Sequence, residues 1–195
     1  MINGMKKMNL EALLRDLIAE DPVRMHILHA VREVNLPDSW VAAGCVRSLV
    51  WDHLHQRVSS PLPKDIDVIW FDKAAISAQT DLALEAELAT LCSGLNGSWS
   101  VKNQARMHQR NADVPYESSA DAMSHWPETA TAVGVRLDQR GAIEVSAPLG
   151  LEDLFALNVR PTARFESDKY AVFLERVRSK RWLKIWPKLT LLTQG

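Results

Sequence analysis

The chain has 195 residues, of which 47% are hydrophobic and 24% are charged, and this ordinary globular composition excludes a disordered, collagen-like or coiled-coil protein. Its 24 acidic and 23 basic residues argue against a protein whose whole surface binds nucleic acid, although a local basic patch fits that balance. The sequence has no apolar run of about 18 residues to span a membrane, and we expect neither a signal peptide nor a disulfide framework around Cys45 and Cys92. We therefore expect a cytoplasmic protein with no membrane partner.

The predicted elements begin with two helices. Apolar residues recur at helical spacing from Leu10 to Ile18, with Asn9 as the cap. Asp21 and Pro22 start a second helix, which ends near residue 34. The elements that follow in chain order are a strand at 40–43, a helix at 44–54, a strand at 66–71, a helix at 74–92, a strand at 99–102, a polar loop with short helix at 103–130, hairpin strands at 133–137 and 142–146, and helices at 152–157 and 168–186.

The order of these elements predicts an α+β fold, in which a mixed β-sheet is flanked by helices, rather than a doubly wound parallel sheet. We expect a single domain over residues 1–195. It divides into an N-terminal helical segment at 9–34, a sheet-containing core at 40–146 and a C-terminal helical segment at 150–187.

Two aspartates open the strand predicted at 66–71. Asp65 and Asp67 share one face, because residues two apart on a strand point the same way, while Ile66, Val68 and Trp70 face the other side. Two carboxylates about 4 Å apart repel by roughly 4 kcal/mol at an effective dielectric constant of 20. A hard divalent ion such as Mg²⁺ compensates that repulsion. A strand that simply opens with two solvated acids is the alternative.

A glycine turn lies about twenty residues before the acid pair. Gly44 follows a predicted strand and opens a helix, so the amides at this helix N-terminus can hold a phosphate. A plain tight turn is the alternative. Together, a phosphate cradle and paired acids are what metal-dependent phosphoryl or nucleotidyl transfer requires.

These motifs resemble those of a known superfamily. The sequence GCVR at 44–47 followed by DID at 65–67 is similar to the G-x-V-R and D-x-D signature of the nucleotidyltransferase fold of the DNA polymerase beta superfamily. The closest local likeness is to the head of CCA-adding and poly(A) polymerases, which usually show Gly-Gly-x-Val-Arg-Asp where this chain has Ala43 to Ser48. The longer pattern resembles a family of small bacterial predicted nucleotidyltransferases of unknown substrate. It is carried by residues 43–52, 65–67, 101–108, 126–129 and 147–155.

The resemblance implies transfer of a nucleoside monophosphate from a nucleoside triphosphate to an acceptor hydroxyl, with two Mg²⁺ or Mn²⁺ ions. It implies that Asp65 and Asp67 hold both ions, and that a third carboxylate on a later strand holds the ion at the acceptor. Glu144 is the candidate for that third carboxylate, with a solvated hairpin acid as the alternative. Asp72 competes with it, but strand parity places Asp72 on the opposite face from Asp67.

The triphosphate has its own candidate contacts. The start of the helix at 44 would hold its β- and γ-phosphates, and Arg47 would neutralise phosphate charge unless it forms a structural ion pair. The run from 102 to 108 combines cations with amides, which suit phosphates or base edges, although a polar loop is the alternative. The nucleotide-binding candidates are Gly44, Cys45, Arg47, Lys102, Asn103, Arg106 and His108.

The acceptor is left open by the sequence. The run at 176–188 interleaves cations with tryptophans and can contact a nucleic acid. Its alternative is an amphipathic helix end whose tryptophans pack inward. Because no long RNA-binding extension is evident, we favour a small molecule or a protein over RNA as acceptor. Two other functions stay open: a non-catalytic nucleotide-binding or interaction module, and a metal-dependent phosphohydrolase that uses the same acids.

Overall fold

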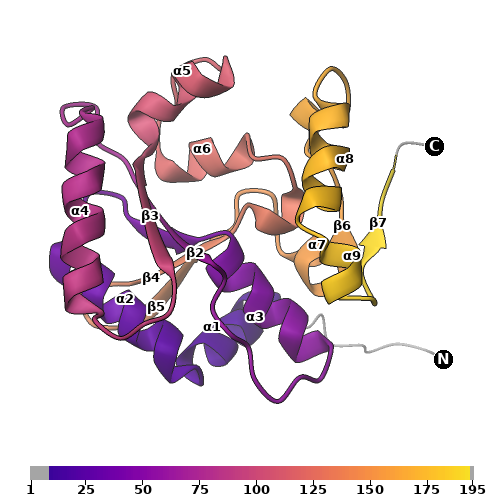
Figure 1. The fold of residues 1–195 in the computed structure, drawn as a ribbon, viewed down its shortest axis with the longest axis horizontal. Coiled ribbons are helices and arrows are strands. Elements are labelled where there is room, and N and C mark those ends of the chain that lie inside the picture. The colour runs from indigo at the N-terminus through magenta and orange to yellow at the C-terminus, as the bar shows by residue number, and fades with distance from the viewer. Residues whose placement is uncertain (1–8, 194–195) are drawn as a thin grey trace.

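The structure, a computed structural model, describes residues 9–193 and contains a five-stranded mixed sheet flanked by helices (Figure 1). The sheet has the order β3-β2-β1-β4-β5. β2 pairs with β3 in parallel, and the other neighbours pair antiparallel. The predicted α+β class is thereby confirmed. The strands are β1 (Trp40–Ala42), β2 (Asp65–Trp70), β3 (Ser98–Asn103), β4 (Gly134–Leu137) and β5 (Ile143–Ser146).

The first helices begin at the residues that their capping signals indicate. Asn9 accepts a hydrogen bond from an amide in the first turn of α1 (Leu10–Ala19), and Asp21 does the same for α2 (Pro22–Val34). α3 (Gly44–Leu54) follows β1 directly. The helix predicted at 74–92 begins later, as α4 (Ala78–Leu91), because Ser77 caps it. The remaining helices are α5 (Met107–Asn111), α6 (Ser119–Ser124), α7 (Glu152–Phe155), α8 (Tyr170–Ser179) and α9 (Trp182–Ile185).

The C-terminal segment differs from its prediction. The single helix expected at 168–186 is divided into α8 and α9, because Arg181 adopts a left-handed conformation with φ of 54°. Two strands that were not predicted, β6 (Asn158–Val159) and β7 (Thr190–Leu191), pair in parallel beside these helices. Each has only two residues, which is too short for an alternating pattern to stand out. Figure 1 shows this segment on the opposite side of the molecule from α4.

The two faces of the sheet have different surroundings. Ile66 and Val68 belong to the main core, which also takes in apolar residues of α1 to α4. The other face carries a small cluster that includes Trp40, Ile69 and Met123 of α6. This second face has the smaller apolar cover, and it is the face to which the aspartates of β2 belong. Among residues 9–193, no helix is both long and apolar enough to cross a membrane.

Candidate active site

The aspartates of β2 share one face of the sheet, as strand parity predicts. Asp67 lies opposite Ala42 of β1 and Ser100 of β3. It comes two residues before the buried Ile69, on the same face of the strand. Asp65 is exposed and Asp67 is half-buried. The ion pairs among residues 9–193 include neither aspartate. Their charges are therefore free to attract a cation.

Burial raises the pKa of Asp67 above its ordinary value. The Ser100 hydroxyl, which donates a hydrogen bond to it, opposes that rise, whereas the neighbouring charge of Asp65 adds to it. The charges of Arg47 and Arg176 lower the pKa, but burial dominates. The Asp67 carboxylate is thus a base that holds its proton more firmly than an ordinary aspartate, and a bound cation would relieve the cost of its charge.

The start of α3 has unengaged backbone amides. Its cap residue, Ala43, adopts a positive φ of 52° and provides no side-chain cap. The Ala43 carbonyl accepts from the amides of Val46 and Arg47, at 3.2 and 2.9 Å. In the described part of the chain, the amides of Gly44 and Cys45 have neither a turn partner nor a capping side chain. Burial raises the pKa of the Cys45 thiol to about 11, so the thiol is neutral at neutral pH. An anion at this helix start would be held by backbone amides.

A cavity of about 370 Å³ joins this helix start to the aspartates. We call it the α3 cavity. The proline loop at 61–63 forms one wall, close enough to Gly44 that an added Cβ would make van der Waals contact with Pro63, at 3.4 Å. The residues that line the cavity include Gly44, Arg47, Lys64, Asp65, Asp67, Arg176, Lys180 and Trp182.

A larger cavity, of about 970 Å³, begins on the other side of Asp67. We call it the α8 cavity. Its lining combines apolar, polar and charged side chains, and it shares Ala43, Asp67, Arg176 and Lys180 with the α3 cavity. The Asp67 carboxylate therefore stands where the two cavities meet. The other lining residues include Ile69, Met107, Arg110, Trp126, Phe165 and Val172.

Arg47 is a buried cation beside the aspartates. Its Nη1 donates to Thr131 Oγ1 at 2.7 Å, and its guanidinium lies 4.2 Å from the ring centre of Trp182 and 4.9 Å from that of Trp51. Burial lowers the pKa of Arg47 to about 10, while the charge of Glu128 opposes that fall. Arg47 thus keeps its positive charge at neutral pH and can form a charge-assisted hydrogen bond with an anion.

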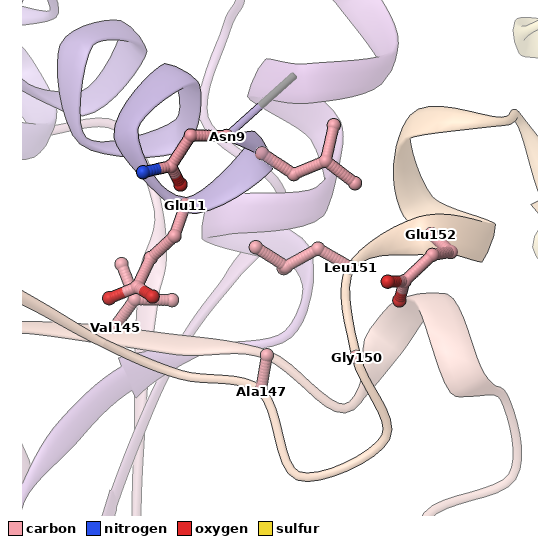
Figure 2. Close-up of a pocket in the computed structure, with 8 residues that line it drawn as sticks. Asn9, Glu11, Val145, Ala147, Gly150, Leu151 and Glu152 are labelled. Atoms are coloured by element: carbon pink, nitrogen blue, oxygen red, sulfur yellow. The ribbon is translucent and has the colours of Figure 1, made fainter. Parts of the chain in front are cut away.

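A third cavity, of about 760 Å³, shares no lining residue with the α3 cavity or the α8 cavity (Figure 2). It is formed by the start of α1, by β5 and by the loop before α7. Figure 2 shows the carboxylates of Glu11 and Glu152 at its sides. Its described lining residues include these two glutamates and no lysine or arginine.

Comparisons with known proteins place the fold. A family described as Nucleotidyltransferase matches residues 29–191, which is most of the chain. The chain belongs to this nucleotidyltransferase family. A solved NMR structure, described as revealing a CCA-adding enzyme head domain, is 36% identical, with a TM-score of 0.83 over 98% of this chain and 100% of that one. Among curated proteins, no sequence match is found.

More distant solved structures share the fold. A CCA-adding enzyme in complex with CTP is 18% identical, with a TM-score of 0.55 over 92% of this chain and 43% of that one. The Thermotoga maritima CCA-adding enzyme complexed with tRNA-CCA is 17% identical, with a TM-score of 0.54 over 93% of this chain and 42% of that one. This chain thus spans less than half the length of those two enzymes.

The fold does not place Glu144, the predicted third carboxylate, beside Asp65 and Asp67. Glu144 lies on the edge strand β5 and pairs with Arg136 of β4, with 2.6 Å between Oε2 and Nε. Strands β1 and β4 lie between β5 and β2. The distance between β5 and β2 is therefore three strand spacings, or roughly 14 Å. Residues 9–193 hold no group of three or more acids, histidines or cysteines placed for a metal ion.

The two aspartates nevertheless fit a divalent cation. Mg²⁺ is usually bound through one or two carboxylates together with substrate phosphates, and it keeps several waters. Asp65 and Asp67 supply the carboxylates, and the α3 cavity offers the phosphates a place beside them. The donor set is therefore sufficient for a cation that arrives with a nucleotide.

Three of the predicted nucleotide contacts have structural partners instead. Lys102 pairs with Glu85 of α4 at 2.6 Å, and Arg106 pairs with the buried Asp81 of the same helix. Asn103 is fully buried, and its side chain forms hydrogen bonds with the backbone of Asp72 and Ala75, in the connection between β2 and α4. None of these three lines either the α3 or the α8 cavity.

The same polar run still reaches the α8 cavity through other residues. His108, the fourth candidate, packs edge-on against Tyr116 and does not line it. Gln104, Met107 and Asn111 do line it. Their spacing of three and four residues is the period of one helix face, and that signal was available in the sequence.

The amphipathic-helix interpretation of the C-terminal run agrees with the structure for the tryptophans but not for two of the cations. Trp182 and Trp186 are buried and pack edge-on against Trp51, as an amphipathic helix end would. Arg176 and Lys180, four residues apart, line both cavities instead of facing away from them. Their i, i+4 spacing was visible, but the surface that they face was not.

Proposed function

We propose that this protein is a Mg²⁺-dependent nucleotidyltransferase, which moves a nucleoside monophosphate from a nucleoside triphosphate to an acceptor hydroxyl. One observation carries the proposal: the Asp65 and Asp67 carboxylates and the uncapped start of α3 line the same cavity. A divalent cation and a polyphosphate need those two features side by side. The family match and the shared fold support it.

Each group has a distinct role in this proposal. Asp65 and Asp67 hold the cation, for which Mn²⁺ is the alternative, and its charge would stabilise the negative charge that builds on the phosphates during transfer. The amide of Gly44, which lines the α3 cavity, holds the terminal phosphates, whereas the predicted contact Cys45 is buried and lines neither cavity. Arg47 and Arg176 neutralise the remaining charge. Glu144 has no part in the proposed site.

The proposed step is an in-line displacement. The acceptor hydroxyl oxygen bonds to the α-phosphorus, the bond from that phosphorus to the β-phosphate oxygen breaks, and pyrophosphate leaves. Asp67 takes the hydroxyl proton, because it is the carboxylate that lines both the α3 cavity and the α8 cavity. The α8 cavity, which opens from Asp67, gives the acceptor its place.

The α8 cavity favours transfer over hydrolysis. A phosphohydrolase needs room only for water beside the acids, whereas about 970 Å³ is at the upper end of the range for small-molecule sites. This supports the acceptor class expected from the sequence, a small molecule or a protein side chain. A non-catalytic nucleotide-binding or interaction module is the alternative. An interaction module would not need the two aspartates, and neither form would release pyrophosphate.

Binding calorimetry with each of the four common nucleoside triphosphates, with and without Mg²⁺, tests the proposal. The wild type is compared with the double variant Asp65→Asn/Asp67→Asn and with Asp16→Asn, a matched change at an exposed position of α1. We expect Mg²⁺-dependent binding that the double variant loses and Asp16→Asn retains. Absence of binding by the wild type, or binding unaffected by the double change, would overturn the proposal.

A further inference from the structure

Glu128 is a fully buried carboxylate that the proposed chemistry does not use. It lies in the loop after α6, with its backbone held by a bridge to Pro161. Its Oε1 accepts a hydrogen bond from Nε of Arg176 at 2.7 Å. Its Oε2 has no hydrogen-bond partner among residues 9–193. A buried charge of this kind is costly to retain unless neighbouring charges offset it.

Arg176 is oriented by this contact. Its side chain is 34% exposed and lines both the α3 and the α8 cavities. Because Glu128 engages Nε, the two terminal nitrogens of the guanidinium remain available for another acceptor. The Arg176 charge also acts on Asp67. The contact with Glu128 therefore leaves two donor nitrogens on a side chain that lines both cavities.

Arg47 depends on the same loop. Its Nη1 donates to Thr131, three residues after Glu128, and the Glu128 charge favours its charged form. The charge of Arg176 has the opposite effect on Arg47, because the two cations repel each other. Glu128 thus lies where it offsets the repulsion between two arginines that line one cavity.

We propose that Glu128 is a positioning residue, which aims Arg176 at the polyphosphate and offsets the repulsion between Arg176 and Arg47. This inference rests on the proposed function, since it assumes that the α3 cavity takes a polyphosphate. It also makes a counter-intuitive prediction. Removing a negative charge close to an anion site should tighten anion binding by simple electrostatics, whereas loss of positioning should weaken it.

The test uses binding of inorganic tripolyphosphate with Mg²⁺, which needs no knowledge of the base. We expect Glu128→Ala to weaken this binding about tenfold, as the loss of one well-placed charge-assisted contact would. Glu128→Gln retains an oxygen that can accept from Arg176 Nε and should recover most of that loss. In an Arg176→Ala background, Glu128→Ala should cause no further weakening.

Arg176→Lys is a second variant, because Glu128 is fully buried and its replacement can disturb folding, whereas Arg176 is partly exposed. Lysine keeps the charge but has no Nε with two further nitrogens beyond it, so we expect weaker binding with an unchanged melting temperature. Tighter binding by Glu128→Ala, or unchanged binding by Glu128→Ala and Arg176→Lys, would overturn the inference. If the wild type binds neither tripolyphosphate nor any nucleoside triphosphate, the proposed function itself fails.

Discussion

The change Asp67→Asn should stabilise the protein while it removes the proposed function. The pKa of Asp67 is raised in the fold from its ordinary value of 3.8, chiefly by burial. The native state therefore binds this proton more tightly than the unfolded chain does. At pH values above the native pKa the carboxylate is charged in both states, and the fold bears the full cost of that charge. Below the ordinary value both states are protonated, and the cost disappears.

Burial is the largest cause of this cost, and strand geometry sizes the part that the Asp65 charge adds. Two residues along a strand separate Asp65 from Asp67 by about 6.6 Å, at which distance two charges repel by roughly 0.6 to 2.5 kcal/mol for dielectric constants between 80 and 20. Because Asp65 is exposed, the lower part of that range applies, and we expect a gain of about 1 kcal/mol. For a chain of this length that gain corresponds to a rise of about 2–4 °C in melting temperature.

Thermal unfolding without added metal or nucleotide, from pH 8 down to pH 4, measures this gain. The advantage of Asp67→Asn over the wild type should shrink as the pH falls, and Asp16→Asn should show no such trend. Asp65→Asn should gain less, and the double variant less than the sum of both, because one repulsion is shared. A variant less stable than the wild type at pH 8, or an advantage independent of pH, would refute the reasoning.

Three further changes separate structural from functional residues. Trp182→Ala should cost about 3–5 kcal/mol in chemical denaturation, because it empties the buried site against Trp51. Asn103→Ala should cost about 1–3 kcal/mol by leaving buried backbone groups unpaired, while calorimetry finds Mg²⁺-nucleotide binding of the folded protein unchanged. Glu144→Gln should also leave that binding unchanged and alter stability by less than about 1 kcal/mol, since its pair with Arg136 is partly exposed; loss of binding would restore Glu144 to the site.

Features set by near neighbours in the chain were predictable from the sequence. The shared face of Asp65 and Asp67 follows from the two-residue period of a strand. The caps of α1 and α2 follow from Asn9 and Asp21, whose side chains bond to amides two or three residues ahead. The start of α3 at Gly44 followed from a glycine after a strand, although Ala43 is the residue that takes the positive φ of the turn. None of these needs knowledge of a distant part of the chain.

Features that depend on tertiary contacts could not be predicted in this way. A pattern of alternating residues identifies β5 as a strand, but it does not reveal that β1 and β4 separate Glu144 from Asp67. The role of Arg176 rests on a partner 48 residues away, Glu128, with no local signal to connect them. Likewise Asn103 has a polar side chain suited to a ligand, yet backbone groups of the β2–α4 connection and the amide of Ala105 engage it.

The central claim is that Mg²⁺ and a nucleoside triphosphate bind between β2 and the start of α3. The most direct measurement is the change in backbone amide NMR shifts when the Mg²⁺ complex of a triphosphate is added to the protein. The account predicts the largest changes at Gly44, Cys45 and Asp67, with the residues around Glu11 and Glu152 unaffected. Changes centred on the cavity of Figure 2, or none at all, would contradict it.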